Sequence, residues 1–276
     1  MKLSMMTLGC PEWDLDTICR EAGRLGFGGV DFRGIRGDLD VTTLPAFTTD
    51  AASTVRLLSD HGLVASGIST SIQVCAPERR TQSLDEARRT LDAAVAVGAS
   101  NVRVFGEGKP ETIGYPEAAR HGRDCVEAIL ALPGARQVSW NFETHDSWVR
   151  STDCKLLLAA VTDSAFGAAW DLGHTRRVGG ETAEQTLEAL GDRIRYVHVK
   201  DAVRADGHPN VMKDGWRYVM PGDGELQLAH AVRLLLKTGY DGWFMFEHEK
   251  RWHPDLEPPE VAFPTFIRWA QQFRDA

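Results

Sequence analysis

Short runs of β-branched and aromatic residues alternate with amphipathic stretches rich in Ala, Leu and Arg along the whole chain. Apolar positions with a period of two indicate strands, and apolar positions every three to four residues indicate helices. The pattern predicts eight strands, near 3–8, 28–32, 63–69, 101–105, 137–143, 166–171, 194–199 and 242–247. It also predicts eight helices, near 14–25, 50–61, 83–98, 116–131, 152–161, 182–190, 225–238 and 259–273.

The regular order of these elements indicates a fold class. Eight strand–helix units in 276 residues leave roughly 34 residues for each unit, which suits an eight-fold barrel. Strands that alternate with helices form parallel sheets through right-handed crossovers. We therefore expect an α/β protein, a (β/α)8 TIM barrel that forms a single domain over residues 1–276. The alternative is an open doubly wound sheet, but no GxGxxG motif follows the first predicted strand.

Several residues indicate where elements begin and end. Gly26, Gly98 and Gly239 follow helical patterns, at the position where glycine commonly closes a helix. Ser83 precedes Glu86 by three residues, which predicts a capping box at the start of the 83–98 helix. Residues 201–224 form the longest insertion, and we expect a mobile or interface loop there.

Polar side chains recur on one face of the predicted strands, opposite apolar side chains. The outer face of a barrel must be apolar because helices cover it, so the polar face points inward. Buried charges need a partner charge, a metal ion or a water-filled site, and barrel enzymes place their chemistry at the carboxyl ends of the strands. The inward-facing polar residues are Asp31, Arg33, Arg103, Ser139, Asn141, Glu143, Tyr196, His198, Lys200 and Glu247.

Four residues stand near the carboxyl ends of four consecutive predicted strands: Glu143, Asp171, His198 and Glu247. Each carboxylate taken alone is better explained as an ordinary rim charge in a salt bridge. Four such positions on successive strands, however, favour a common site. Three carboxylates and an imidazole suit Mn, Mg, Co or Zn, so we expect one divalent metal ion with coordination positions left for a substrate carbonyl and hydroxyl.

Composition and charge limit the partners and the cellular setting. The formal net charge of −8 disfavours nonspecific nucleic-acid binding. No apolar run approaches the ~20 residues of a membrane span, and the N-terminal sequence does not resemble a secretory signal. The five cysteines are odd in number and form no CxxC motif, which favours reduced thiols in a cytoplasmic protein. We therefore expect neither nucleic acid nor membrane as a partner.

Five motifs, NFETH, WDLGH, YVHVKD, PGDGEL and FMFEHEKRW, resemble in order and spacing the xylose-isomerase-like TIM-barrel superfamily. The chain looks like its sugar phosphate isomerase/epimerase branch, which includes ketose 3-epimerases, hydroxypyruvate isomerase, and inosose isomerases and dehydratases. The resemblance covers nearly the whole chain and is strongest over 137–250.

The resemblance implies a single divalent ion, with Mn as the first expectation and Mg, Co or Zn as alternatives. Its ligands map onto Glu143, Asp171, His198 and Glu247. Family epimerases use the two glutamates as a proton-transferring pair on opposite faces of the substrate, and His174 matches a position near substrate oxygens. The implied substrate is a small keto-sugar or polyol ketone, and family habit implies a homo-oligomer.

Other residues are secondary candidates for substrate binding: His145, Lys200 and Arg33. A solvated loop position is the alternative for His145, and an ion pair with Asp201 is the alternative for Lys200. Arg33 and Arg103 could instead neutralise interior carboxylates. Glu107 lies in a glycine-flanked loop after the fourth strand, either as an acid of the pocket or as a solvated loop residue.

Four functions agree with these features to different degrees. The first is a metal-dependent isomerase or epimerase of a keto-sugar or inosose, with proton transfer through a metal-stabilised enediolate. The second is a lyase or dehydratase, because the same enediolate can expel a leaving group. The third is the endonuclease branch of the superfamily, which needs three zinc ions and more ligands, and which the net charge opposes. The fourth is a non-catalytic sugar-binding barrel. A free sugar is favoured over a phosphorylated one because no clear glycine-rich phosphate loop follows the last two strands.

Overall fold

The computed structural model describes residues 1–273. Its main sheet is a closed barrel in which eight parallel strands follow the order β1-β10-β7-β6-β5-β4-β3-β2. Pairing of the first strand with the last closes the barrel, so the predicted TIM barrel is confirmed and the open doubly wound sheet is wrong. The strands are β1 (Lys2–Met6), β2 (Gly29–Phe32), β3 (Val64–Gln73), β4 (Asn101–Phe105), β5 (Ser139–Glu143), β6 (Phe166–Asp171), β7 (Ile194–Val199) and β10 (Trp243–Phe246).

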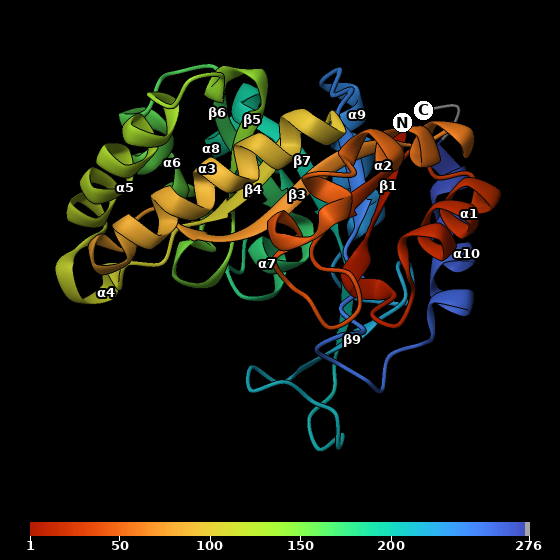
Figure 1. The fold of residues 1–276 in the computed structure, drawn as a ribbon. Helices are drawn as coiled ribbons and strands as arrows, with labels where there is room; N and C mark the ends of the chain where they lie inside the picture. The colour runs from red at the N-terminus through yellow and green to blue at the C-terminus, as the bar shows by residue number, and fades with distance from the viewer. Residues whose placement is uncertain (274–276) are drawn as a thin grey trace.

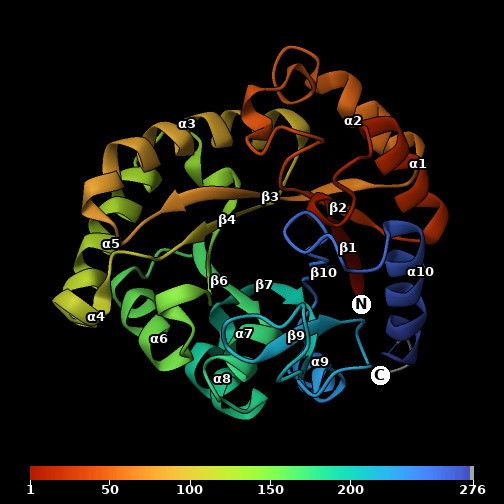
Figure 2. The same ribbon diagram turned by 90° about the horizontal axis from the view of Figure 1, so that it is seen from below.

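Helices surround the strands (Figures 1 and 2). An apolar layer fills the space between them, and it includes fully buried Phe32, Phe142 and Phe246. Two short helices, α4 and α7, were not predicted from the sequence. The helices are α1 (Leu15–Leu25), α2 (Ala51–Asp60), α3 (Arg80–Val97), α4 (Pro110–Ile113), α5 (Tyr115–Leu130), α6 (Ser151–Ala160), α7 (Leu172–Arg177), α8 (Ala183–Leu190), α9 (Leu228–Lys237) and α10 (Pro259–Ala270).

The predicted capping box at Ser83 is wrong, because α3 already begins at Arg80. The Ser83 hydroxyl instead exchanges hydrogen bonds with the backbone of Gln73, at 3.2 Å each. The Glu86 carboxylate accepts the backbone N–H of Ser71 at 2.7 Å. Both side chains therefore anchor the extended end of β3 on α3. The predicted C-terminal glycine is confirmed, since Gly98 adopts a φ of 72° and its N–H bonds the last turn.

The 201–224 insertion contains a small antiparallel sheet of β8 (Asp201–Arg204) and β9 (Trp216–Val219). Figure 1 shows the segment between these strands projecting from one end of the barrel. The alternative for Lys200, an ion pair with Asp201, is wrong, because Lys200 pairs with Asp171, Glu247 and Glu249. Asp201 is buried, and its carboxylate accepts backbone N–H groups of Ala202, Gly222, Gly224 and Leu226 at 3.0–3.4 Å.

The barrel interior is apolar at one level and polar at the next. A small interior cluster contains Met6, Leu8, Ala169, Tyr196 and Met245. The Tyr196 hydroxyl donates to the buried Asp31 carboxylate at 3.0 Å, which confirms that Asp31 faces inward. None of the helices among residues 1–273 combines the length and apolarity needed to cross a membrane.

Candidate metal centre

Strand order determines which side chains meet at the carboxyl end of the barrel. β5, β6, β7 and β10 are consecutive neighbours, and their register pairs Asp171 with His198 and His198 with Met245, two residues before Glu247. Glu143 ends β5 and Asp171 ends β6. One ligand atom from each of Glu143, Asp171, His198 and Glu247 lies within 4.8 Å of the others. All four side chains are buried, so the fold assembles the predicted quartet.

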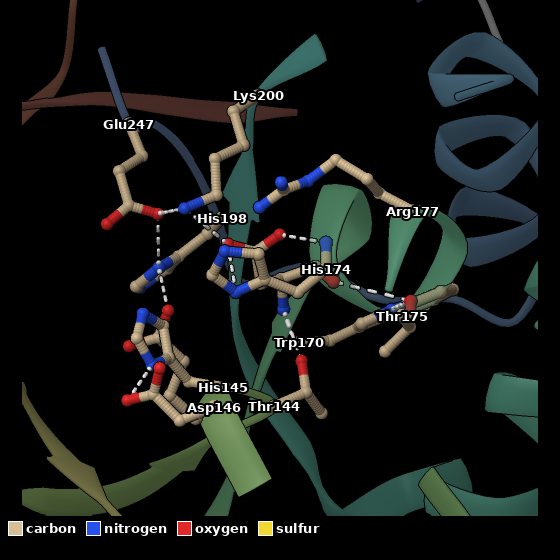
Figure 3. A network of polar contacts seen from close by, with 12 residues as sticks. Thr144, His145, Asp146, Trp170, His174, Thr175, Arg177, His198, Lys200 and Glu247 are labelled. Atoms are coloured by element: carbon tan, nitrogen blue, oxygen red, sulfur yellow. Dashed lines mark hydrogen bonds and ion pairs between the residues drawn. The ribbon is translucent and has the colours of Figure 1, made fainter. Parts of the chain in front are cut away.

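His198 lies between Glu143 and Glu247, and Figure 3 shows its ring beside Glu247. Its Nδ1 is 3.2 Å from Glu143 Oε1 and 3.1 Å from Glu247 Oε2. Burial lowers the pKa of His198, but the charges of Glu247 and Glu143 outweigh burial and raise it to about 10. Positive charge therefore stabilises this cluster, whether a proton or a metal ion supplies it.

Lys200 supplies a fixed positive charge to the site. Its Nζ is 2.9 Å from Asp171 Oδ2, 2.9 Å from Glu247 Oε2 and 2.7 Å from Glu249 Oε1. Figure 3 shows the contact with Glu247. The side chain is only 3% exposed, so it is desolvated and depends on these carboxylates. The structure therefore brings Lys200 into the quartet.

The donor set fits a divalent cation. Both oxygens of Glu143 and Oδ2 of Asp171 are buried without a hydrogen-bond donor in good geometry, a costly arrangement for carboxylates. Burial raises the pKa of Asp171 to about 6, although Lys200 opposes that shift. Burial also raises the pKa of Glu143, but the charges of His198 and Arg103 lower it to about 2. Carboxylate oxygens beside one imidazole are ligands that Mg, Mn, Co and Zn accept.

Two further histidines stand beside Glu143. His174 lies in α7, whose N-cap Asp171 accepts the His174 backbone N–H at 2.7 Å. The His145 ring packs edge-on against His174, with ring centroids 4.6 Å apart, and its Nδ1 is 2.6 Å from Asp146 Oδ2. Single atoms of Glu143, His145 and His174 also lie within 4.8 Å of one another. Both predicted histidines therefore border the quartet.

The two arginines take different positions. Arg103 Nε is 3.1 Å from Glu143 Oε2, with both side chains buried, so Arg103 compensates an interior carboxylate. Arg33 donates to the Leu39 carbonyl at 3.2 Å and the Ser71 hydroxyl at 2.8 Å. It lines a groove of about 620 Å³ with residues of α3. Across residues 1–273, no hydrogen bond or ion pair joins Arg33 to the quartet.

Sequence reasoning missed two contributors. Glu249 completes the carboxylate shell of Lys200, and its spacing of two from Glu247 was the available signal. Arg177, almost fully buried, ion-pairs with Asp214 of the insertion and donates to the Tyr218 hydroxyl at 3.3 Å. It lies three residues after His174 on α7, a helix that the sequence pattern does not reveal. The insertion is thus joined to the site through Arg177.

A family model for the xylose isomerase-like TIM barrel matches residues 19–272. The chain belongs to this family. Curated relatives match over shorter stretches. An inosose dehydratase of Geobacillus kaustophilus is 30% identical over 116 residues, 38% of this chain and 35% of that protein. One from Clostridium beijerinckii is 31% identical over 126 residues, 42% and 39% of the two chains. The chain thus aligns with well under half of these relatives' length.

Several solved structures share the fold along nearly the whole chain. The IOLI protein with a binding zinc atom superposes with a TM-score of 0.78 at 15% identity, over 99% of this chain and 97% of that one. The probable 3-DHS dehydratase AsbF from Bacillus anthracis gives 0.76 at 15% identity over all of both chains. The 3-keto-D-glucoside 4-epimerase YcjR from E. coli gives 0.74 at 16% identity over 99% of both. At these sequence identities, the similarity shows a shared fold and nothing more.

Proposed function

We propose that this protein is a divalent-metal-dependent isomerase or epimerase that removes a proton beside the carbonyl of a small keto-sugar or inosose. The observation that carries the proposal is the buried quartet on four neighbouring strand ends, with single ligand atoms within 4.8 Å. Glu143, Asp171, His198 and Glu247 would hold the ion, and Mn is our first candidate, before Mg, Co and Zn. A divalent ion there would polarise the carbonyl and stabilise negative charge on its oxygen.

The protein's own groups would move the proton. Glu143 ends β5 and Glu247 directly follows β10, with His198 between them. Glu247 contacts His198 and Lys200 through Oε2, so its Oε1 could exchange a proton with carbon, whereas Glu143 Oε2 would do so beside Arg103. A proton taken by one glutamate on one face of the substrate and a proton delivered by the other on the opposite face would invert the stereocentre. Lys200 Nζ, 2.9 Å from Glu247 Oε2, would favour the ionised form of that carboxylate.

Substrate oxygens would be bound by the polar groups that border the quartet. His145 and His174 lie on one side of Glu143, and Lys200 lies on the side of Glu247. These three groups can hydrogen-bond the hydroxyls of a polyol ketone and orient the reacting carbon. We assign Arg33 a more distant substrate contact, from the neighbouring groove of about 620 Å³.

A dehydratase is the second candidate, and the names of the curated relatives favour it. Proton loss would again come first, and hydroxide would then leave from the next carbon. That departure needs an acid, and His145, His174 and Lys200 are the groups at hand. Elimination and inversion therefore share the first step and differ only in the second.

The test measures exchange of solvent deuterium into a panel of ketoses and inososes with metal-loaded protein. We expect exchange with at least one substrate, and Glu143→Gln and Glu247→Gln should each lower its rate at least 100-fold. Glu188→Gln, an exposed glutamate on α8, serves as the matched control and should exchange normally. Retention of exchange by both site variants would show that the base assignment is wrong.

Product analysis separates the two candidates. An epimer or isomer with deuterium at the reacting carbon supports the first, and an unsaturated ketone supports the dehydratase. Sugar binding without any exchange, with or without metal, would contradict both and favour a non-catalytic barrel.

We also propose a cytoplasmic setting and a homo-oligomer. The first rests on the five scattered cysteines, which are free and buried, and the second on family habit. Light scattering after size-exclusion chromatography measures the oligomeric state.

A further inference from the structure

The insertion places one side chain, Tyr218, against the charged groups beside the metal centre. Tyr218 stands on β9 and is only 8% exposed. Its hydroxyl accepts a hydrogen bond from Arg177 Nη2 at 3.3 Å and donates one to Glu249 Oε1 at 3.4 Å. The same carboxylate oxygen accepts a hydrogen bond from Lys200 Nζ at 2.7 Å. The Tyr218 hydroxyl is therefore two hydrogen bonds away from the ammonium group of Lys200.

The Tyr218 ring contacts two cations. Its centroid is 5.7 Å from Lys200 Nζ and 5.3 Å from the central guanidinium carbon of Arg177, and both distances allow cation–π attraction. Lys200, Glu247 and Glu249 line a small cavity with Tyr218, of about 10 Å³, which is about the smallest volume that holds a water molecule. Tyr218 thus closes the space beside Lys200 from the side of the insertion, and a smaller side chain there would admit more water.

Arg177 is held in place by a second residue of the insertion. Its guanidinium group forms an ion pair with Asp214, whose side chain is 34% exposed. Figure 3 shows the Arg177 side chain extending from α7 toward Lys200. This ion pair and the Tyr218 hydroxyl thus connect the exposed part of the insertion with the charged groups around Lys200.

We propose that Tyr218 is a positioning residue: its hydroxyl orients Glu249, and its ring keeps water from Lys200. Asp214 acts on the same groups from a distance, because it fixes the Arg177 guanidinium that holds the Tyr218 hydroxyl. The carboxylates around Lys200 include a glutamate to which we assign proton transfer, so the insertion contributes to the reaction. This effect on turnover rests on the proposed function, whereas the protection of Lys200 from water does not.

The first test measures the access of water to Lys200 in metal-free protein. Nuclear magnetic resonance of ¹⁵N-labelled lysine gives the exchange rate of each ammonium group with water, and Lys200→Arg assigns the signal. We expect the Lys200 protons to exchange at least about 10-fold more slowly than those of Lys213, an exposed lysine of the insertion. Tyr218→Phe keeps the ring and should keep this protection, whereas Tyr218→Ala should lose most of it.

Circular dichroism shows whether each variant is folded. Tyr218→Leu, which keeps a branched apolar side chain in β9, replaces Tyr218→Ala if that variant does not fold. Wild-type Lys200 protons that exchange as fast as those of Lys213 would overturn the proposal. Full protection of Lys200 in a folded variant without the ring would overturn it as well.

The second test asks whether Asp214 and Tyr218 act in series. With a substrate from the exchange panel, Tyr218→Phe and Asp214→Asn should each lower kcat about 10-fold, as loss of an outer partner does at metal sites. The double variant should lose about as much as either single variant, because both changes interrupt one path. Asp206→Asn, which changes an exposed acid of the same insertion, is the matched control and should keep the wild-type kcat.

The kcat values decide the positioning role. An unchanged kcat in either single variant would contradict it, and so would independent losses that multiply to about 100-fold in the double variant. A lower kcat at unchanged Tm in Tyr218→Phe assigns the effect to the hydroxyl rather than to folding. If no substrate of the panel turns over, the proposed function fails, while the exchange of the ammonium protons still decides whether Tyr218 protects Lys200.

Discussion

At the scale of single residues, Lys200 is a buried charge that depends on three carboxylates for its stabilisation. Its ammonium group is almost fully buried and faces Asp171, Glu247 and Glu249 within 2.9 Å. Burial lowers the pKa of Lys200, but these three carboxylates outweigh burial and raise it well above its usual range. The lysine is thus the charge that lets three acids stay together when no metal is bound.

We predict that Lys200→Met destabilises the metal-free protein by about 3–5 kcal/mol, because removal of the ammonium group leaves its partner carboxylates buried without a compensating charge. Urea unfolding of chelator-treated protein measures this loss. Lys155→Met removes an exposed lysine from α6 and should change stability by less than about 0.5 kcal/mol. Equal stability of the two variants would mean that the site carboxylates are not charged in the metal-free protein.

At the scale of elements, Asp201 organises the insertion. It stands at the start of β8, and its single carboxylate accepts backbone N–H groups on both sides of the small sheet, from Ala202 to Leu226. Gly224 approaches it so closely that a Cβ there would lie 1.9 Å from Asp201 Oδ1. The PGDGEL segment is therefore shaped around this carboxylate.

We predict that Asp201→Ala lowers the free energy of unfolding by about 3 kcal/mol, because it leaves several buried N–H groups without an acceptor. Hydrogen exchange over 216–226 should rise at the same time. Asp206→Ala, in the exposed tip of the same insertion, should leave both unchanged. Normal protection of 216–226 in Asp201→Ala would show that other contacts hold the segment.

Elements also show what the sequence could predict. The predicted strand bounds agree with the structure to within a few residues, because strands packed between the helices and the barrel interior have a local periodicity of apolar side chains. Glu143, Asp171 and His198 were predicted as site residues because they lie near the ends of these strands. The capping-box prediction for Ser83 and Glu86 was wrong because their hydrogen-bond partners, Gln73 and Ser71, lie on another element. Arg177 was missed for a related reason, since its partner Asp214 lies in a long insertion. Local patterns predict elements, whereas contacts between distant segments require the fold.

At the scale of the whole molecule, closure of the barrel does not depend on the candidate metal site. The barrel closes through backbone pairing of β1 with β10 and through an apolar layer beneath the helices, and neither feature involves the quartet. The quartet instead concentrates negative charge at one end of the barrel, around His198 and Lys200. The fold should therefore persist without metal, and the metal should add stability by binding the folded state alone.

We predict that a chelator leaves the far-ultraviolet circular dichroism unchanged but lowers Tm, and that added Mn²⁺ restores it. Binding to the folded state contributes about 2.7 kcal/mol when the free ion is at 100 times its Kd. His198→Ala should lose this response because the ring lies between Glu143 and Glu247, whereas His230→Ala removes a half-exposed histidine and should keep it. If neither chelator nor Mn²⁺ changed the Tm of the wild type, metal binding at this end of the barrel would be contradicted.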